Sequence, residues 1–299
     1  MSREASAPSP DLARLAALLA GRCLSILTGA GCSTESGIPD YRGPETRRRA
    51  RDPMKYRAFA SSEEARRRYW ARAVVGWPRI AAARPNAAHH AIARMQQGGS
   101  VVELITQNVD RLHHAAGSDA VELHGALAEV RCMGCGRIED REAVQARLEA
   151  LNPGWQALCA EVAPDGDAEL PGELATRFRV TECLACGGPL KPNVVFFGET
   201  VPRERVERAY AAVDASEALL VVGSSLAVFS GYRFVRRAAA RGIPVAIVNL
   251  GESRGDPHAS LVVSARAGEL LPRLAEALAA DTQRARSAKS SKLESSSGW

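Results

Sequence analysis

Short runs of consecutive apolar residues recur along the chain, and segments with helical periodicity separate them. Six of these runs are rich in β-branched residues, which is typical of strands buried on both faces: Cys23–Thr28, Val101–Thr106, Val194–Phe197, Ala218–Val222, Pro244–Asn249 and the weaker Leu261–Val263. Helical patterns cover Leu12–Ala20, Glu63–Val75, Asn86–Met95, Arg203–Val213, Tyr232–Arg241 and Glu269–Ala280. Because strands that alternate with helices join through right-handed crossovers, the pattern predicts an α/β fold with a doubly wound, parallel, Rossmann-like sheet.

Two stretches interrupt this alternation. Residues 43–84 are rich in helical pattern and contain no strand, and residues 126–190 carry a pair of cysteines near each end with proline, glycine and acidic residues between them. We expect these two insertions to form a smaller helical and zinc-binding domain, and residues 11–42, 85–125 and 191–280 to form the Rossmann-like domain. The final residues, 281–299, are polar and of low complexity, which predicts a disordered tail.

The composition is that of an ordinary globular protein: 46% of the 299 residues are apolar and 24% are charged, so a core can form without disulfides. No apolar run reaches the roughly 18 residues that span a bilayer, and the N-terminus lacks the pattern of a secretory signal. The net charge of +5 is mild, and we interpret its densest patch, Arg47–Arg51, as a solvated loop. We therefore expect a cytoplasmic monomer that binds neither membranes nor nucleic acid.

Four of the seven cysteines form two C-x-x-C pairs, Cys132 with Cys135 and Cys183 with Cys186. In a chain without an export signal this spacing indicates metal binding rather than disulfides, and four thiolates suit a tetrahedral zinc ion. Protein ligands fill every position of such a site, so the predicted zinc is structural and not catalytic. A redox C-x-x-C is the competing interpretation, but a redox pair would need no second pair.

The first predicted strand leads into a glycine-rich turn, Gly29-Ala30-Gly31-Cys32-Ser33. Such a turn at the end of a strand lets the backbone approach a pyrophosphate and point N–H groups at it, although a tight turn without a ligand has the same composition. Thr34 stands where a dinucleotide fingerprint has its third glycine, which disfavours a hydride-transfer dehydrogenase. The irregular segment 37–43 follows, and a loop of this kind can fold over a bound nucleotide.

Polar residues also follow the other predicted strands. Thr106-Gln107-Asn108-Val109-Asp110 ends the second strand, where open α/β sheets bind ligands, although these side chains could simply cap the next helix. Gly223-Ser224-Ser225 and Asn249-Leu250-Gly251 end two later strands and suit ribose and adenine recognition, with turn formation as the alternative. His124 precedes Gly125 at the junction with the cysteine insertion, where an imidazole can act as a general base or fill a purely structural position.

Together these motifs resemble the sirtuin family over residues 11–280. The resemblance is carried, in this order along the chain, by Gly29–Ser33, Gly37–Arg42, Thr106–Asp110, Leu123–Gly125, the two cysteine pairs, Lys191–Glu199, Gly223–Ser225 and Asn249. The segments Arg68–Arg72, Gly76–Pro78 and Ala163–Asp167 are similar to the class II subgroup. The resemblance implies an enzyme that consumes NAD+ to remove acyl groups from protein lysine side chains, giving nicotinamide, O-acyl-ADP-ribose and free lysine.

The resemblance also implies roles for individual residues. Asn108 and Asp110 hold the nicotinamide end of NAD+, and His124 is the base that deprotonates a ribose hydroxyl. The implied NAD+ contacts are Gly29, Ala30, Gly31, Ser33, Thr34, Pro39, Asp40, Tyr41, Arg42, Gln107, Asn108, Val109, Asp110, Gly223, Ser224, Ser225, Asn249, Leu250, Gly251 and Ala267. An acyl-lysine peptide is implied to add as a strand beside Val195, Phe196, Phe197, Gly198 and Glu199, with Leu226 on its other side.

Some positions depart from the common pattern of the family. Asn193 stands where aspartate is frequent and Tyr41 where many members have phenylalanine, but neither change removes a catalytic group. Members that remove succinyl groups carry a tyrosine and an arginine at offsets that Arg47 and Ala50 occupy here, so a succinyl preference is not expected. Two alternatives stay open: a protein mono-ADP-ribosyltransferase, and a non-catalytic NAD-sensing or zinc-scaffold module, against which the presence of the catalytic set argues.

Overall fold

Six parallel strands form the central sheet of the computed structural model, which describes residues 9–41, 53–158, 168, 170 and 175–296. They are β1 (Leu24–Thr28), β2 (Val101–Thr106), β3 (Ala120–Glu122), β7 (Ala218–Val222), β8 (Val245–Val248) and β9 (Leu261–Val263). Their spatial order is β3-β2-β1-β7-β8-β9, with every neighbouring pair parallel. The order reverses at β1, and ligands bind at this switch point in doubly wound sheets. The predicted fold class is confirmed.

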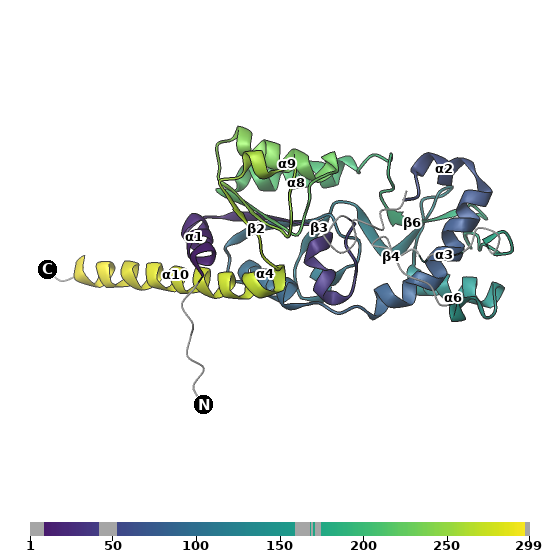
Figure 1. Cartoon of the computed structure of the whole chain (residues 1–299), viewed down its shortest axis with the longest axis horizontal. Helices are drawn as coiled ribbons and strands as arrows, with labels where there is room; N and C mark the ends of the chain where they lie inside the picture. Colours follow the sequence, from purple (N-terminus) through teal and green to yellow (C-terminus); the bar gives the residue numbers. More distant parts are fainter. Residues whose placement is uncertain (1–8, 42–52, 159–167, 169, 171–174, 297–299) are drawn as a thin grey trace, which may run out of the picture.

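Alternate residues of β1, β7 and β8 enter two different cores, which explains why these strands read as continuous apolar runs. Leu24 and Ile26 of β1 pack against α1 (Pro10–Leu19), α4 (Ala87–Gln97) and α10 (Ala267–Ser296). Leu27 of the same strand faces α8 (Arg203–Ala215) and α9 (Phe229–Ala240). Figure 1 shows these two helical layers on opposite sides of the sheet.

The two insertions pack together as a smaller lobe. In it β4 (Gly125–Cys132) pairs in antiparallel fashion with β5 (Ile138–Asp140) and β6 (Leu190–Val194). The helices of this lobe are α2 (Tyr56–Ser61), α3 (Glu63–Ala82) and α6 (Arg141–Leu151), and they share one apolar core with β4 and β6. Trp70 of α3 is buried there, and its indole N–H donates to the Leu190 carbonyl at 3.1 Å, so α3 is fixed against β6.

One predicted strand differs from the structure. The run Val194–Phe197 is not a parallel strand of the central sheet: the strand is β6, it ends at Val194, and it belongs to the antiparallel sheet. A β-branched apolar run reads the same in both settings, so the sequence alone could not separate them. The central sheet takes its sixth strand from β3 instead, which is too short to stand out as a run.

The last helix is longer than expected. We predicted a disordered tail from residue 281, whereas the backbone of α10 continues as helix to Ser296 and extends past the rest of the fold (Figure 1). Its first half packs through buried leucines such as Leu271 and Leu274. That packing nucleates the helix, and the alanine, arginine and lysine residues that follow propagate it at little cost. Across the described residues, every helix is too short or too polar to span a bilayer.

Candidate active site

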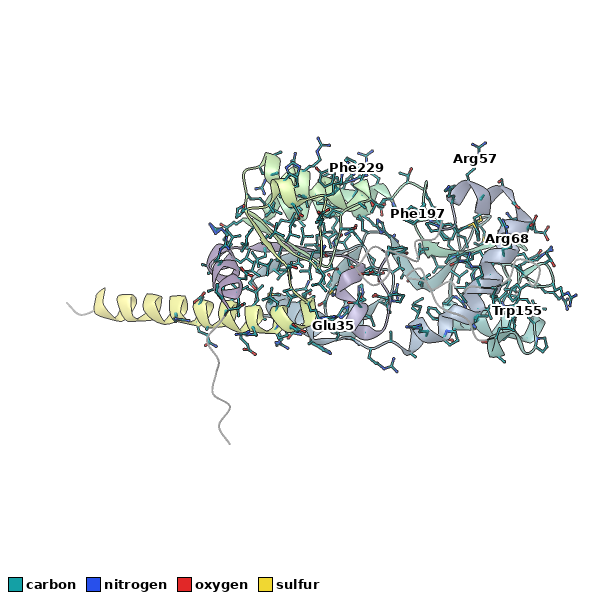
Figure 2. All side chains as sticks on the ribbon, in the orientation of Figure 1. Glu35, Arg57, Arg68, Trp155, Phe197 and Phe229 are labelled. Atoms are coloured by element: carbon teal, nitrogen blue, oxygen red, sulfur yellow. The ribbon has the colours of Figure 1, made fainter. Side chains whose placement is uncertain are left out.

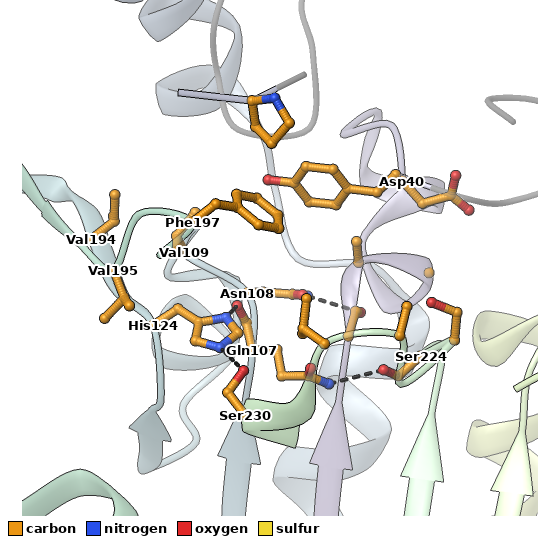
Figure 3. Close-up of a pocket in the computed structure, with 18 of the residues that line it drawn as sticks. Asp40, Gln107, Asn108, Val109, His124, Val194, Val195, Phe197, Ser224 and Ser230 are labelled. Atoms are coloured by element: carbon orange, nitrogen blue, oxygen red, sulfur yellow. Dashed lines mark hydrogen bonds between the residues drawn. The ribbon is translucent and has the colours of Figure 1, made fainter. Parts of the chain in front are cut away.

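A cavity of about 740 Å³ opens where the carboxyl ends of the central strands meet the smaller lobe (Figure 3). Its first wall consists of the turns after β1, β2, β7 and β8, and the second wall is the segment that follows β6. The lining residues include Gly29–Gly31, Gln107–Asp110, His124, Val194–Val201, Gly223–Val228 and Asn249–Glu252. The volume falls in the range of roughly 300–1,000 Å³ that is usual for small-molecule sites.

The turns after β1 and β7 interlock through glycines. The Gly31 N–H donates to the Gly223 carbonyl at 2.9 Å, and a Cβ on Gly31 would lie 2.9 Å from the Gly223 Cα. Gly223 has a φ of +60°, and a Cβ there would lie 2.4 Å from the Cys32 nitrogen. A side chain at either position would therefore push the two turns apart. Glycine is needed here because two backbones touch.

The interlocked turns hold backbone donors that are not used inside the protein. Among the described residues, the amide N–H groups of Ala30, Ser224 and Ser225 have no hydrogen-bond partner. All three residues line the cavity. Adjoining backbone N–H groups of this kind form anion sites, so the two turns fit the pyrophosphate and ribose of NAD+.

Polar side chains after β2 converge on the first of these turns. The Asn108 amide donates to the Gly29 carbonyl at 3.0 Å and to the Ser33 hydroxyl at 3.1 Å, and Ser33 donates to the Asp110 carboxylate at 2.7 Å. Asp110 also accepts from the Leu112 N–H at 2.9 Å. The same side chain therefore caps the next helix and borders the cavity. Burial raises the pKa of the Asp110 carboxyl above its usual value, and these two hydrogen bonds oppose the shift.

A neutral layer of buried side chains supports the turn from below. His113 lies 2.9 Å from the Thr28 hydroxyl, and the ring of His89 lies 4.7 Å from the ring of His113. Burial lowers the pKa of His89 to about 4 and that of His113 well below its usual value. Burial also raises the pKa of the neighbouring Cys32 thiol far above its usual range. The two histidines and the thiol of this layer are therefore uncharged beside the Asp110 carboxyl.

His124 faces the cavity as a single tautomer. Its Nδ1 lies 2.9 Å from the Gln107 carbonyl oxygen, which can only accept, so Nδ1 carries the proton. Its Nε2 is then an acceptor, and it lies 2.8 Å from the Ser230 hydroxyl (Figure 3). Burial lowers the pKa of His124 to about 4; the hydrogen bond to Gln107 opposes this shift and the charge of Arg205 adds to it. The Nε2 lone pair is thus available as a base at neutral pH.

The second wall of the cavity is tied to the same histidine. The N–H of Val195 donates to the His124 carbonyl at 2.8 Å. Further along, the Glu199 carboxylate lies 3.0 Å from the buried Lys191 ammonium, and Phe197 remains 38% exposed at the mouth. The segment is therefore fixed relative to the imidazole and presents an aromatic side chain to incoming ligands.

The four paired cysteines meet at one point of the smaller lobe. Their sulfur atoms all lie within 4.8 Å of one another; the Cys132–Cys186 pair is 3.5 Å apart and the Cys135–Cys183 pair 3.8 Å. Four sulfurs at about 2.3 Å from a tetrahedral zinc ion are about 3.8 Å from each other, so the cluster fits zinc. The cysteines lie outside the lining of the cavity, which agrees with a structural ion.

Most of the predicted site residues border the cavity. Those that line it are Gly29, Ala30, Gly31, Ser33, Asp40, Tyr41, Gln107, Asn108, Val109, Asp110, His124, Val195, Phe196, Phe197, Gly198, Glu199, Gly223, Ser224, Ser225, Leu226, Asn249, Leu250 and Gly251. Thr34, Pro39 and Ala267 are not among them: the Thr34 hydroxyl donates back to the Gly31 carbonyl, and Ala267 is buried at the start of α10. Arg42 and the segment Arg47–Arg51 lie outside the described residues.

The sequence analysis missed two residues that act on the His124 imidazole. Ser230 contacts His124 across 106 residues of chain, and Arg205 on α8 influences its pKa. A single serine or arginine at a helix start gives no signal by itself, because its role appears only when α8 and α9 dock on the sheet. Leu226 was predicted as a substrate contact, and it lines the cavity, but its φ is +52° and its side chain packs in the core beside α9.

Comparisons with known proteins agree with this geometry. A model of the Sir2 family matches residues 29–230. An NAD-dependent protein deacetylase of Bordetella bronchiseptica is 55% identical over 263 residues, which are 87% of this chain and 96% of that protein. An NAD-dependent protein deacetylase of Xanthomonas axonopodis pv. citri is 52% identical over 272 residues, which are 89% and 93% of the two chains.

Solved structures are similar as well. A Sir2 protein with a p53 peptide and NAD+ superposes with a TM-score of 0.69 at 30% identity, covering 88% of this chain and 96% of the other. A Sir2 protein bound to an acetylated peptide gives a TM-score of 0.69 at 29% identity, covering 89% and 97%. The cavity, the cysteine cluster and these matches lead to one conclusion: the chain belongs to the Sir2 family.

Proposed function

We propose that this chain is an NAD+-dependent protein-lysine deacylase in which His124 is the general base. The observation that carries the proposal is the position of the His124 Nε2, an unprotonated nitrogen that faces the same cavity as the interlocked glycine turns. A neutral imidazole beside a nucleotide site suits deprotonation of a ribose hydroxyl. The names of the relatives, which are NAD-dependent protein deacetylases, support the same activity.

Each part of the site has a role in this proposal. The free N–H groups of Ala30, Ser224 and Ser225 hold the phosphates and a ribose, and Asn108 and Asp110 orient the nicotinamide end. When bound, NAD+ supplies the anomeric carbon to which the acyl oxygen adds as nicotinamide leaves. The two reactants are then held in one geometry, which lowers the entropic part of the barrier.

His124 takes up a proton in the second half of the reaction. For this, the Ser230 hydroxyl releases the Nε2 lone pair, and a ribose hydroxyl takes its place. The Gln107 carbonyl keeps the hydrogen bond from Nδ1, and this bond stabilises the ring as it becomes positively charged. The fixed tautomer therefore both aims the base and favours its protonated product.

The zinc ion has no chemical role in this scheme. The residues that would hold it are Cys132, Cys135, Cys183 and Cys186, and all four positions of a tetrahedral ion are then filled by protein. A bound zinc supplies a cross-link between the turns that flank β4 and β6. Because β6 leads into the second wall of the cavity, the ion supports the wall on which the substrate lies.

The substrate side of the proposal rests on the exposed mouth of the cavity. We infer that an acyl-lysine peptide lies as an added strand between Phe197–Glu199 and Ser225–Val228, both of which line the cavity. Solved Sir2 structures with an acetylated peptide support a peptide substrate. We also assign the chain to the class II subgroup, on the segments Arg68–Arg72 and Gly76–Pro78.

The proposal is tested by incubating the purified chain with NAD+ and an acetyl-lysine peptide. We expect free nicotinamide, deacetylated peptide and O-acetyl-ADP-ribose in equal amounts by mass spectrometry. His124→Ala should lower the rate about 10²- to 10⁴-fold, whereas Arg14→Ala, on the exposed face of α1, should leave it unchanged. Full activity in the His124 variant would remove the base assignment. A protein carrying an added ADP-ribose mass, without deacetylated peptide, would show mono-ADP-ribosyl transfer instead.

A further inference from the structure

Arg233 is a positively charged residue in the wall of the cavity. It lies on α9 one helical turn after Ser230, which contacts the catalytic imidazole. Its side chain lines the cavity and is half-buried. Its Nε is fully buried and lacks a hydrogen-bond partner, and Arg233 forms no ion pair with any other described residue. A half-buried guanidinium without a partner carries a desolvation cost that a bound anion would offset.

The position of the guanidinium is set by an aromatic ring. Its central carbon lies 5.1 Å from the centroid of Phe229, one turn earlier on α9 and 48% exposed. Figure 2 labels Phe229, the first residue of α9, and Phe197 beside the smaller lobe, and both aromatic side chains are exposed. The cation–π contact holds Arg233 at the mouth of the cavity without neutralising its charge.

A second depression continues outward from Arg233. It has a volume of about 490 Å³ and is lined by Tyr210, Phe229, Arg233, Arg236 and Arg237. Arg237 is paired with Asp214 at 2.7 Å. Arg236 is exposed and, like Arg233, has no ion-pair partner in the described part of the chain. The surface that leads away from the active site therefore carries two uncompensated positive charges between two aromatic side chains.

This surface is placed to meet the peptide rather than its acyl group. Arg233 lies on α9, the helix that begins directly after Ser225–Val228, and this segment is one of the two between which the peptide strand is proposed to lie. The acyl group has to point inward, toward the His124 imidazole, whereas the second depression leads outward along α9. A positive charge at this place contacts the side chains that flank the modified lysine.

We propose that Arg233, extended by Arg236, binds the carboxylate of an aspartate or glutamate close to the acyl-lysine, so that the enzyme selects acyl-lysine sites in acidic sequence. The proposal rests on the deacylase function above and deepens it. The partner is defined by its chemistry: an extended, negatively charged segment of a substrate protein. Opposite charges at such a rim steer association and discriminate between partners.

The test is a scan of flanking positions. Peptides share a central acetyl-lysine in a neutral sequence, and one glutamate, glutamine or lysine occupies each neighbouring position in turn on both sides. At the position that faces Arg233, we expect kcat/KM for the glutamate peptide to exceed that for the glutamine peptide about three- to tenfold. Raising the ionic strength to about 0.5 M should reduce this ratio.

Three variants separate recognition from a structural role. Arg233→Gln should bring the glutamate-to-glutamine ratio close to one, and Arg233→Glu should reverse the preference toward lysine at the same position. Arg14→Gln removes a positive charge from α1, which lies at the far side of the sheet, and should keep the wild-type ratio (Figure 1). A misfolded variant would lose activity on all peptides, so it could not reverse the preference from glutamate to lysine as Arg233→Glu is expected to do.

Several results would overturn the proposal. A wild-type scan that is flat at every position, or a preference that survives Arg233→Gln, would do so. A higher KM for NAD+ in Arg233→Gln with an unchanged ratio would assign the guanidinium to the nucleotide phosphates, and a loss confined to succinyl-lysine peptides with neutral flanks would assign it to the acyl chain. Binding of the labelled peptides is also measured without NAD+, so a failure of deacylation would end the proposed function and still leave this measurement to decide the role of Arg233.

Discussion

The Ser230 hydroxyl lies 2.8 Å from Nε2 of His124, although the two residues are 106 positions apart. His124 follows β3 at the start of the smaller lobe, and Ser230 lies in the first turn of α9 on the opposite layer. Both ring nitrogens of the imidazole are therefore hydrogen-bonded, Nδ1 to the Gln107 carbonyl and Nε2 to Ser230. The base depends on the docking of α9 for its orientation.

This contact predicts a moderate loss in Ser230→Ala. The ring keeps its anchor at Nδ1, so the tautomer survives, but it gains freedom to turn away from the cavity. We expect kcat to fall about three- to tenfold with little change in the KM for NAD+. Steady-state rates with an acetyl-lysine peptide measure this. Ser61→Ala is the matched control, because the Ser61 hydroxyl bonds only to the backbone of its own helix. An unchanged kcat in Ser230→Ala would refute the positioning role.

The buried histidines predict that acid destabilises the fold. Burial lowers the pKa of His89 and of His124 to about 4 and that of His113 well below its usual value. Between about pH 6.5 and pH 4 the unfolded chain binds protons on these rings and the folded chain does not, so stability is lost as the pH falls. Burial also raises the pKa values of the Asp110 and Glu122 carboxyls, and these two groups act in the opposite direction to the three rings.

We expect the free energy of unfolding to fall by about 1 kcal/mol per pH unit for each such ring in this window. Urea unfolding at pH 7 and pH 5 checks the sign, with the zinc content measured at both values so that metal loss is not mistaken for imidazole protonation. A free energy of unfolding that stays level or rises toward pH 5, at constant zinc content, would show that the three rings are not held neutral.

The interlocked glycines predict a loss of NAD+ binding in Gly223→Ala. The new Cβ would lie 2.4 Å from the Cys32 nitrogen, so the turns after β1 and β7 must separate. Gly242→Ala is a matched control, because Gly242 also has a positive φ, +71°, but a Cβ there meets nothing within 4 Å. Both variants incur the strain of a left-handed alanine, about 1 kcal/mol, and only Gly223→Ala disturbs the cradle.

We therefore expect the affinity for NAD+ to fall at least about tenfold in Gly223→Ala and to stay unchanged in Gly242→Ala, as isothermal titration calorimetry can measure. Thermal unfolding of both variants separates loss of binding from loss of fold. Equal affinities in the two variants would mean that the contact between the turns is not what shapes the nucleotide site.

The cysteine cluster predicts one zinc ion per chain, with an effect on stability and only through it on activity. Cys186→Ser should lose the ion, lower the melting temperature and reduce activity as the wall after β6 loosens. Cys23→Ser should do none of these, because Cys23 is an exposed thiol outside the cluster. Metal analysis and calorimetry make the comparison. Full zinc content in Cys186→Ser would disprove the four-cysteine site.

The features that could be predicted from the sequence are those whose signal lies within a short segment of the chain. The parallel sheet was predictable because its inner strands β1, β7 and β8 are buried on both faces, and the zinc site because each C-x-x-C pair is complete within four residues. The glycines of Gly29–Ser33 and Gly223–Ser225 were predicted as ligand turns, but nothing in either motif says that the two turns touch each other. That contact exists only because β7 lies next to β1.

The sequence could not predict residues whose role depends on how the helices dock on the sheet. Ser230 and Arg205 look like ordinary helix residues until α9 and α8 cover the sheet beside His124. The run Val194–Phe197 shows the complementary error: it was predicted as a parallel strand, whereas only Val194 belongs to a strand, the antiparallel β6, because composition does not specify the partner strand. Local chemistry was thus predicted better than the neighbours that each segment acquires.

The meeting of Gly31 with Gly223 also makes the nucleotide cradle a late event in biosynthesis. The turn after β1 leaves the ribosome early, whereas β7 and its turn belong to the last third of the chain. Until β7 arrives, one edge of β1 is open and can pair with strands of other nascent chains. A product that stops before residue 218 would hold half a cradle and an uncovered edge, so chaperone protection during translation should matter more for this protein than its size suggests.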